Sequence, residues 1–128
     1  MKHLAIMVAL VASLAACAPA PQQPAPGLTV IAARPAERAL LAGMRAYDDA
    51  QYAESEKQMQ LALATGLASP KDRAAANKYL AFVYCTSQRV AQCEDAFRAA
   101  RAADPAFALS RSEAGHPQWG PVYRKLFP

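Results

Sequence analysis

The chain has 128 residues, a formal net charge of +4 and 54% hydrophobic residues. Without the N-terminal targeting segment described next, residues 35–128 are enough for one small domain with a modest core. Acidic and basic residues alternate along this part and form no basic run, so we expect no nucleic-acid partner.

The first 16 residues have the pattern of a secretory signal peptide. A short basic start precedes an apolar run from Leu4 to Leu14, which is about half the length that a membrane-spanning helix needs. Small residues then lead directly to Cys17. We therefore leave residues 1–16 out of the expected fold.

The segment Leu14-Ala15-Ala16-Cys17 resembles the lipobox of bacterial lipoproteins. This resemblance implies that the Cys17 thiol carries a diacylglycerol, that the chain is cut before Cys17, and that the new amino end receives an acyl chain such as palmitate. Several acyl chains hold a protein on a membrane almost permanently. Ala18 in place of Asp favours the outer membrane, on its periplasmic side. The alternative is an ordinary signal cut elsewhere, with Cys17 incidental.

The next segment is expected to be a tether. "APAPQQPAPG", residues 18–27, has four prolines in ten positions. Such a sequence favours an extended polyproline II chain, which spans roughly 30 Å at about 3.1 Å per residue. Residues 17–34 would then hold the domain of residues 35–128 off the bilayer, although a linker without a length requirement would have the same composition.

Local signals in the domain predict four helices, and helix is favoured by the richness in Ala, Leu, Glu, Lys and Arg. Pro35 suits a first helical position, Gly66 a C-terminal cap and Ser69 an N-terminal cap. The expected helices cover about residues 35–50, 52–65, 70–87 and 90–104.

The last two of these helices match the spacing of the tetratricopeptide repeat, W-x2-L-G-x2-Y followed by A-x3-F and P. Asn77 replaces the usual aromatic residue and Cys93 the usual small alanine. The spacing predicts that Val90, Cys93, Phe97 and Ala100 lie on one face of the last helix, where small residues let the two helix axes approach closely. The matching residues are Asn77, Leu80, Ala81, Tyr84, Cys93, Phe97, Ala100 and Pro105.

The first two helices repeat this plan 38 residues earlier, with Tyr52 where such repeats carry an aromatic residue between their helices. The corresponding positions are Ala39, Ala42, Gly43, Ala46, Ser55, Met59 and Ala62. We therefore expect an all-α fold of two tetratricopeptide-like hairpins with a short C-terminal capping helix. A generic four-helix bundle is the alternative.

The C-terminal tail is expected to close the fold, because two repeats are too few to bury a continuous core. Its last helix would begin at Pro121. The apolar residues of the tail either cover the preceding helix or form an exposed patch for a partner; they are Trp119, Val122, Tyr123, Leu126 and Phe127.

The sequence has little that could perform chemistry. His116 is the single histidine left after removal of the signal, and it lies in a Gly-His-Pro turn. Asp48 and Asp49 lie together at a helix end with no third ligand nearby. Because the known catalytic and phosphate-binding motifs are missing, we expect no enzyme activity, no metal, no cofactor beyond the lipid on Cys17 and no small-molecule substrate.

Cys85 and Cys93 are expected to form a disulfide. Zinc would need four ligands, and a thioredoxin-like site would need a CxxC motif. In the repeat register, Cys85 ends one helix and Cys93 faces it from the first turn of the next, and the periplasm is oxidising. Two separate buried thiols are the alternative.

Beyond the generic repeat, residues 37–127 resemble the TssQ family, the short lipoproteins encoded with type VI secretion systems. The most specific parts are Tyr84-Cys85, Cys93, "DPAFALS" and "EAGHPQWGPV". The resemblance implies an accessory lipoprotein at the outer membrane that contacts an envelope-spanning secretion machine.

The expected function is therefore that of a periplasmic protein–protein adaptor. Its binding surface would be the concave side formed by the first helix of each repeat, with Arg38, Arg45, Asn77 and Lys78 as candidate partner-binding residues. The alternatives are a pilotin-like lipoprotein for a secretin or pilus system and a regulator or scaffold of cell-wall enzymes.

Overall fold

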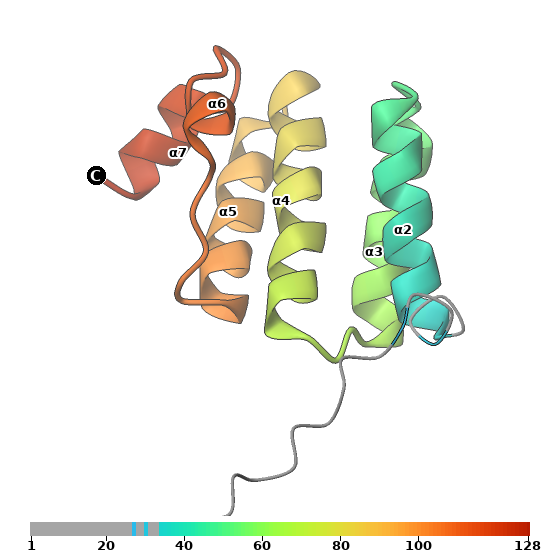
Figure 1. The fold of residues 1–128 in the computed structure, drawn as a ribbon. Coiled ribbons are helices and arrows are strands. Elements are labelled where there is room, and N and C mark those ends of the chain that lie inside the picture. The colour runs from blue at the N-terminus through green and yellow to red at the C-terminus, as the bar shows by residue number, and fades with distance from the viewer. Residues whose placement is uncertain (1–26, 28–29, 31–33) are drawn as a thin grey trace, which may run out of the picture.

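The computed structural model describes Gly27, Val30 and residues 34–128. These residues form helices and no strand, which confirms the all-α fold of helical hairpins with a short C-terminal helix. The expected signal peptide, Cys17 and nearly all of the tether lie outside the described residues. The helices in Figure 1 are α2 (Pro35–Asp48), α3 (Tyr52–Thr65), α4 (Pro70–Thr86), α5 (Val90–Ala103), α6 (Arg111–Ala114) and α7 (Gly120–Leu126).

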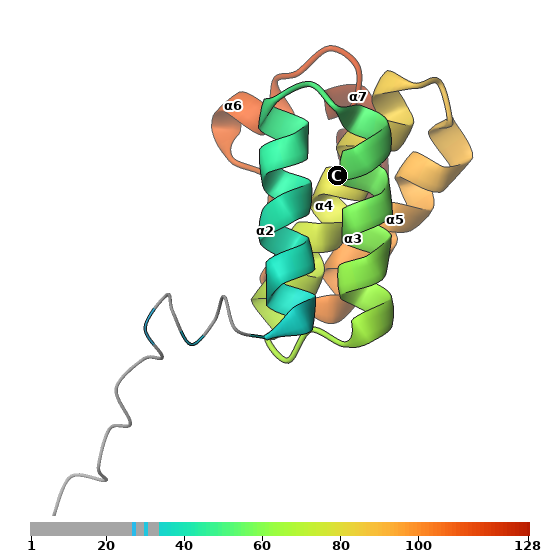
Figure 2. The ribbon, with the colours of Figure 1, turned by 90° about the vertical axis from the view of Figure 1, so that its right-hand side faces the viewer.

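The long helices form two antiparallel hairpins, α2 with α3 and α4 with α5. The first helices, α2 and α4, lie on one side of the molecule, and α3 and α5 lie on the other (Figures 1 and 2). This is the arrangement that two stacked tetratricopeptide-like repeats would have.

The turns of the two hairpins have the same backbone geometry. Ala50 has a φ of 58° and Gln88 a φ of 62°, and both lie in the left-handed region that residues with side chains seldom adopt. The N–H that follows each of them donates to a carbonyl five residues back, Gln51 to Ala46 at 2.7 Å and Arg89 to Tyr84 at 2.8 Å. The two turns are 38 residues apart, the same offset as the sequence repeat.

The helix ends are those that the sequence predicts. Pro35 and Pro70 each open a helix, and the Ser69 hydroxyl accepts a hydrogen bond from the backbone N–H of Asp72 at 3.3 Å. Gly66 ends α3 with a φ of 103°, a conformation that glycine adopts without steric cost.

The core lies where the repeat positions of the hairpins meet. At Gly43 an added Cβ would lie 2.9 Å from Cε of the buried Met59, so the absence of a side chain lets α2 and α3 approach closely. Cys93, Phe97 and Ala100, which were predicted to share one helix face, are fully buried.

Val90, the fourth residue named for this face, is exposed over 47% of its surface. It is the first residue of α5 and lies beside the turn, beyond the last residue of α4.

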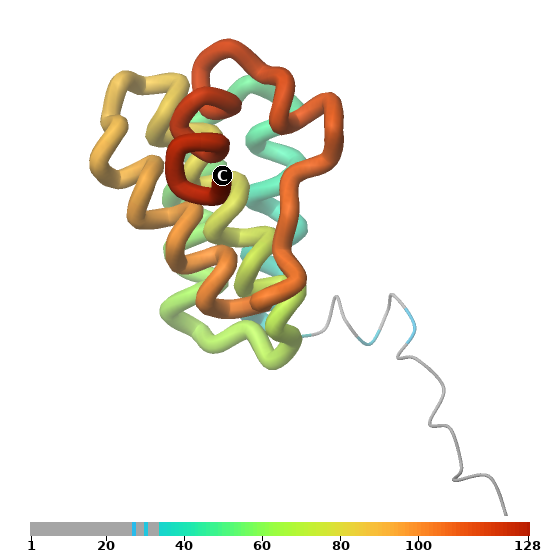
Figure 3. Tube along the Cα trace, turned by 90° about the vertical axis from the view of Figure 1, so that its left-hand side faces the viewer, coloured from blue at the N-terminus to red at the C-terminus, as the bar shows by residue number. Residues whose placement is uncertain are grey.

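The C-terminal tail caps the second hairpin. Residues 104–110 run back along the hairpin to α6 and α7 (Figure 3). Trp119 stacks on Phe82 of α4 with ring centroids 4.1 Å apart, and Tyr123 meets Phe97 of α5 edge to face at 5.3 Å. Trp119 and Tyr123 are buried, whereas the three other apolar residues of the tail, Val122, Leu126 and Phe127, are half-buried.

Candidate functional site

A disulfide closes the turn of the second hairpin. The sulfur atoms of Cys85 and Cys93 are bonded, and their Cα atoms are 5.2 Å apart. Both residues are buried. In this state neither cysteine presents a thiol that could act as a nucleophile or bind a metal, so the pair supports the turn between α4 and α5.

The same turn directs Arg89 toward the first hairpin. Its Nη1 and Nη2 atoms donate to the two carboxylate oxygens of Glu56 on α3, at 3.0 and 2.6 Å. The guanidinium also lies 4.5 Å from the ring centroid of Tyr84. Hydrogen bonds from Arg89 lower the pKa of Glu56, and the same bonds raise the pKa of Arg89.

A second polar contact between the hairpins lies nearby. Nε2 of Gln60, on α3, donates to the hydroxyl oxygen of Tyr84 at 3.1 Å. Gln60 and Glu56 are one helical turn apart, so both links join the same face of α3 to the end of α4 and the turn that follows it.

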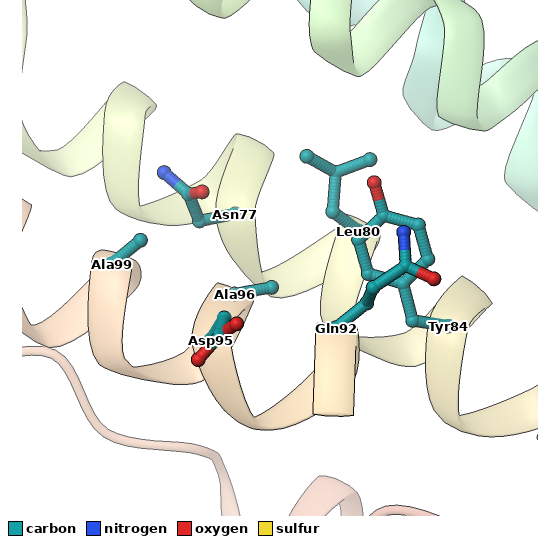
Figure 4. Close-up of a pocket in the computed structure, with 7 residues that line it drawn as sticks. All are labelled: Asn77, Leu80, Tyr84, Gln92, Asp95, Ala96 and Ala99. Atoms are coloured by element: carbon teal, nitrogen blue, oxygen red, sulfur yellow. The ribbon is translucent and has the colours of Figure 1, made fainter. Parts of the chain in front are cut away.

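A pocket of about 280 Å³ lies between α4 and α5, and Figure 4 shows the side chains that line it. We call it the α4–α5 pocket. Leu80 and Ala96 are buried and form an apolar floor, whereas Gln92, Asp95 and Ala99 are exposed. The full lining consists of Asn77, Leu80, Tyr84, Gln92, Asp95, Ala96 and Ala99.

The polar groups of the α4–α5 pocket include hydrogen-bond acceptors and donors. Nδ2 of Asn77 donates to the carbonyl of Arg73 at 2.9 Å, which leaves the amide oxygen of Asn77 as an acceptor. The amide of Gln92 has no hydrogen bond to a described residue. One oxygen of Asp95 accepts from Arg98 at 3.0 Å. Acceptors and donors thus surround an apolar floor, which is the usual composition of a small ligand or peptide site.

The four candidate partner-binding residues lie on the first helices of the two hairpins, α2 and α4, and differ in their surroundings. Arg38 and Arg45 are exposed on α2, and Asn77 lines the α4–α5 pocket. Nζ of Lys78 lies 2.6 Å from a carboxylate oxygen of Glu113, so it attaches α6 to α4. Helix periodicity alone does not reveal this ion pair, because Glu113 is 35 residues further along the chain.

The charge of Glu113 is maintained by this contact. Burial raises the pKa of its carboxyl, but hydrogen bonds from Lys78 and from Ser110 outweigh burial, and the net pKa is lowered. The backbone and hydroxyl of Ser110 also complete a capping box with Glu113 at the start of α6. Glu113 therefore orders α6 and ties it to the second hairpin.

Besides the buried Ala96, sequence reasoning missed three exposed residues of the α4–α5 pocket: Gln92, Asp95 and Ala99. They lie at positions i, i+3 and i+7 of α5, beside the buried face formed by Cys93, Ala96 and Phe97. This spacing marks a second stripe along the helix. A stripe of two polar residues and a small one resembles ordinary solvated helix surface, so only the position of α4 makes it part of a pocket.

Aromatic rings fill the space between the hairpins on the side of α2 and α4. Tyr47 meets Tyr52 and Tyr79 edge to face, with ring centroids 5.5 and 5.1 Å apart. Burial, and then the neighbouring Tyr52 and Tyr79, raise the pKa of Tyr47 to about 12. The Tyr47 hydroxyl therefore stays protonated at neutral pH.

The other residues considered for chemistry have structural surroundings. The His116 ring stacks on Trp119 with centroids 3.4 Å apart, and its Nδ1 accepts from the backbone N–H of Gln118 at 3.3 Å. Asp48 and Asp49 are exposed at the end of α2. Within the described residues, no three His, Cys, Asp or Glu side chains are grouped as a metal site would require.

Among the helices that the structure describes, none combines the length and the apolar character needed to cross a membrane. The chain matches no protein-family model, no curated protein and no solved structure.

Proposed function

We propose that this chain is an outer-membrane lipoprotein whose helical domain acts as a periplasmic protein–protein adaptor, accessory to a type VI secretion system. The lipobox at Cys17, the proline-rich tether and the resemblance of residues 37–127 to the TssQ family support the location and the system. The α4–α5 pocket is the observation that carries the binding role.

The α4–α5 pocket suits a short peptide or one turn of a partner helix. The apolar floor at Leu80 and Ala96 accepts a small apolar side chain, and the short side chain of Ala99 lets a backbone approach α5 closely. The amide groups of Asn77 and Gln92 then pair with the partner's backbone. Such a site gives specificity by shape and polar contacts and needs no catalytic group.

A pair of variants tests this function in the intact envelope. We expect crosslinked pull-down of the full-length protein to recover a component of the secretion system. Ala99→Arg should fill the α4–α5 pocket and sharply reduce recovery. Ala102→Arg adds the same side chain at an exposed position of α5 that does not line the pocket, and should leave recovery unchanged.

The result also separates the rival functions. Recovery of a secretin or pilus component would replace the proposal with a pilotin-like role, and recovery of a wall hydrolase would replace it with a regulator of cell-wall enzymes. If no secretion component is recovered from crosslinked envelopes, the proposal is wrong.

A further inference from the structure

The hairpin topology gives the domain two distinct ends. The end that we name the tether end comprises residues 34–38, 65–73 and 103–106, where α2 and α4 begin and α3 and α5 finish (Figure 1). The opposite end, the turn end, comprises residues 45–57 and 84–93 and contains the turns of both hairpins. The tether joins the domain at Arg34, so the chain from the expected membrane anchor reaches the tether end first.

The outward-facing charge at the tether end is positive. The side chain of Arg34 is half exposed, and Arg38 and Lys71 are exposed. Neither Arg38 nor Lys71 forms an ion pair with a described residue. These three cations lie at the beginnings of α2 and α4.

The carboxylates of the tether end offset these cations only in part. Glu37 is buried, with 6% of its surface exposed, and its nearest cation is Arg34 at 3.8 Å. Asp104 accepts a hydrogen bond from the backbone N–H of Ala106 at 3.0 Å, and Asp72 is half-buried in the first turn of α4. None of them is as exposed as Arg38 or Lys71.

The turn end has the opposite character. Asp48 and Asp49 are exposed and form no ion pair with a described residue. The two carboxylates of α3 at this end are already paired, one with Lys57 at 3.6 Å and the other with Arg89 at 2.6 Å. Of the cations there, Arg45 is left to balance the two aspartates.

We infer that the tether end is a membrane-facing surface, on which Arg34, Arg38 and Lys71 contact the phosphate groups of anionic phospholipids in the leaflet that holds the anchor. Cationic side chains close to such a leaflet are attracted to it, and exposed carboxylates are repelled. The charge of the tether end and the place where the chain joins it favour the same orientation. This inference rests on the lipid anchor at Cys17 in the proposed function, and it takes residues 17–34 as a linker without a length requirement, not as a spacer that holds the domain off the bilayer.

The orientation has a consequence for the α4–α5 pocket. With the tether end on the headgroups, the hairpins stand steeply on the membrane and the turn end points away from it. The pocket, which lies along the sides of α4 and α5, then opens parallel to the membrane surface. A partner would approach from the side.

Lysine labelling tests the orientation with an internal control. The processed full-length protein is reconstituted into vesicles of phosphatidylethanolamine with phosphatidylglycerol, or of phosphatidylcholine alone, and treated with a water-soluble amine reagent. We expect Lys71 to be labelled several-fold more slowly in the anionic vesicles, with recovery at high salt. Lys57, 72% exposed at the turn end, should be labelled equally in both.

Two variants of equal charge change make the test specific. Arg38→Glu should restore the labelling of Lys71 in anionic vesicles, whereas Arg45→Glu at the turn end should leave Lys71 protected. If Lys71 is labelled equally in both vesicle types while the protein remains anchored, the orientation is wrong and the adaptor function is untouched. Protein that does not stay with the vesicles would overturn the anchor and the orientation together.

Discussion

Arg89 and Glu56 form a two-point ion pair across the boundary between the hairpins, with hydrogen bonds of 3.0 and 2.6 Å. Arg89 is held in place by the turn that the Cys85–Cys93 disulfide closes. One covalent bond within the second hairpin thus positions the charged group that attaches it to the first.

Glu56→Gln should destabilise the domain by about 1 kcal/mol, because it removes a partly buried, two-point ion pair between the hairpins. Urea unfolding at pH 7 would measure the loss. Asp49→Asn removes one exposed carboxylate that has no ion pair to a described residue, and should change stability little. An equal loss in both variants would contradict the importance of this ion pair.

The contribution of Glu56 should disappear in acid. Its folded-state pKa is lowered by Arg89, so the stabilisation is complete above the unfolded-state value of about 4.3 and is lost as the pH falls through the folded-state pKa. The difference in unfolding free energy between the natural protein and Glu56→Gln should therefore fall toward zero in acid. A difference that stays constant with pH would argue against a charge effect.

Replacing both Cys85 and Cys93 with alanine should cost about 2.5 kcal/mol, the chain-entropy estimate for a loop of about nine residues. Urea unfolding of this variant should coincide with that of the natural protein in the presence of reductant. Thiol labelling of unfolded, unreduced protein should find no reactive thiol except any on Cys17. Two further reactive thiols would show that the disulfide is not formed.

Gly120→Ala should loosen the C-terminal cap, at a cost of about 1–3 kcal/mol, because an added Cβ would overlap the backbone carbonyl oxygen of Ala114. Gly115→Ala is the matched control, since its Cβ would lie 3.5 Å from the nearest atom, an ordinary contact. The fluorescence of Trp119, which stacks on Phe82, reports the docking of the cap during unfolding. Equal stability of the two variants would contradict the close approach of α6 and α7.

Cys17→Ser should release the protein from membranes, because no acyl chain can then be attached to residue 17. Fractionation of cells that express the full-length variant would show the protein in the soluble periplasmic fraction. Unchanged membrane association would refute the lipobox interpretation. As a control, the double variant Cys85→Ala with Cys93→Ala keeps Cys17 and should remain membrane-bound.

The sequence predicted the four long helices to within two residues at each end, because their boundaries depend on local groups. Pro35, Gly66 and Ser69 act within one turn of their own positions. The short helix α6 was missed. Ser110 and Glu113 have the spacing of a capping box, but no apolar run follows them to indicate a helix.

The proposed binding surface was harder to predict, because it depends on contacts between distant segments. Lys78 pairs with a residue 35 positions away, and Val90 is exposed although Cys93, Phe97 and Ala100 are fully buried. Periodicity identifies which residues share a helix face. It does not identify where the neighbouring helix stops or which exposed side chains a later segment covers.

The placement of the α4–α5 pocket has a mechanical consequence. In the proposed function the chain leads to the membrane through the first hairpin, whereas every residue that lines the pocket belongs to the second. A force between a bound partner and the anchor must therefore cross the boundary between the hairpins, where Arg89 contacts Glu56 and Tyr84 contacts Gln60. The contacts at that boundary would therefore carry the force. The Cys85–Cys93 disulfide would keep the turn that contains Arg89 from unfolding before these contacts break.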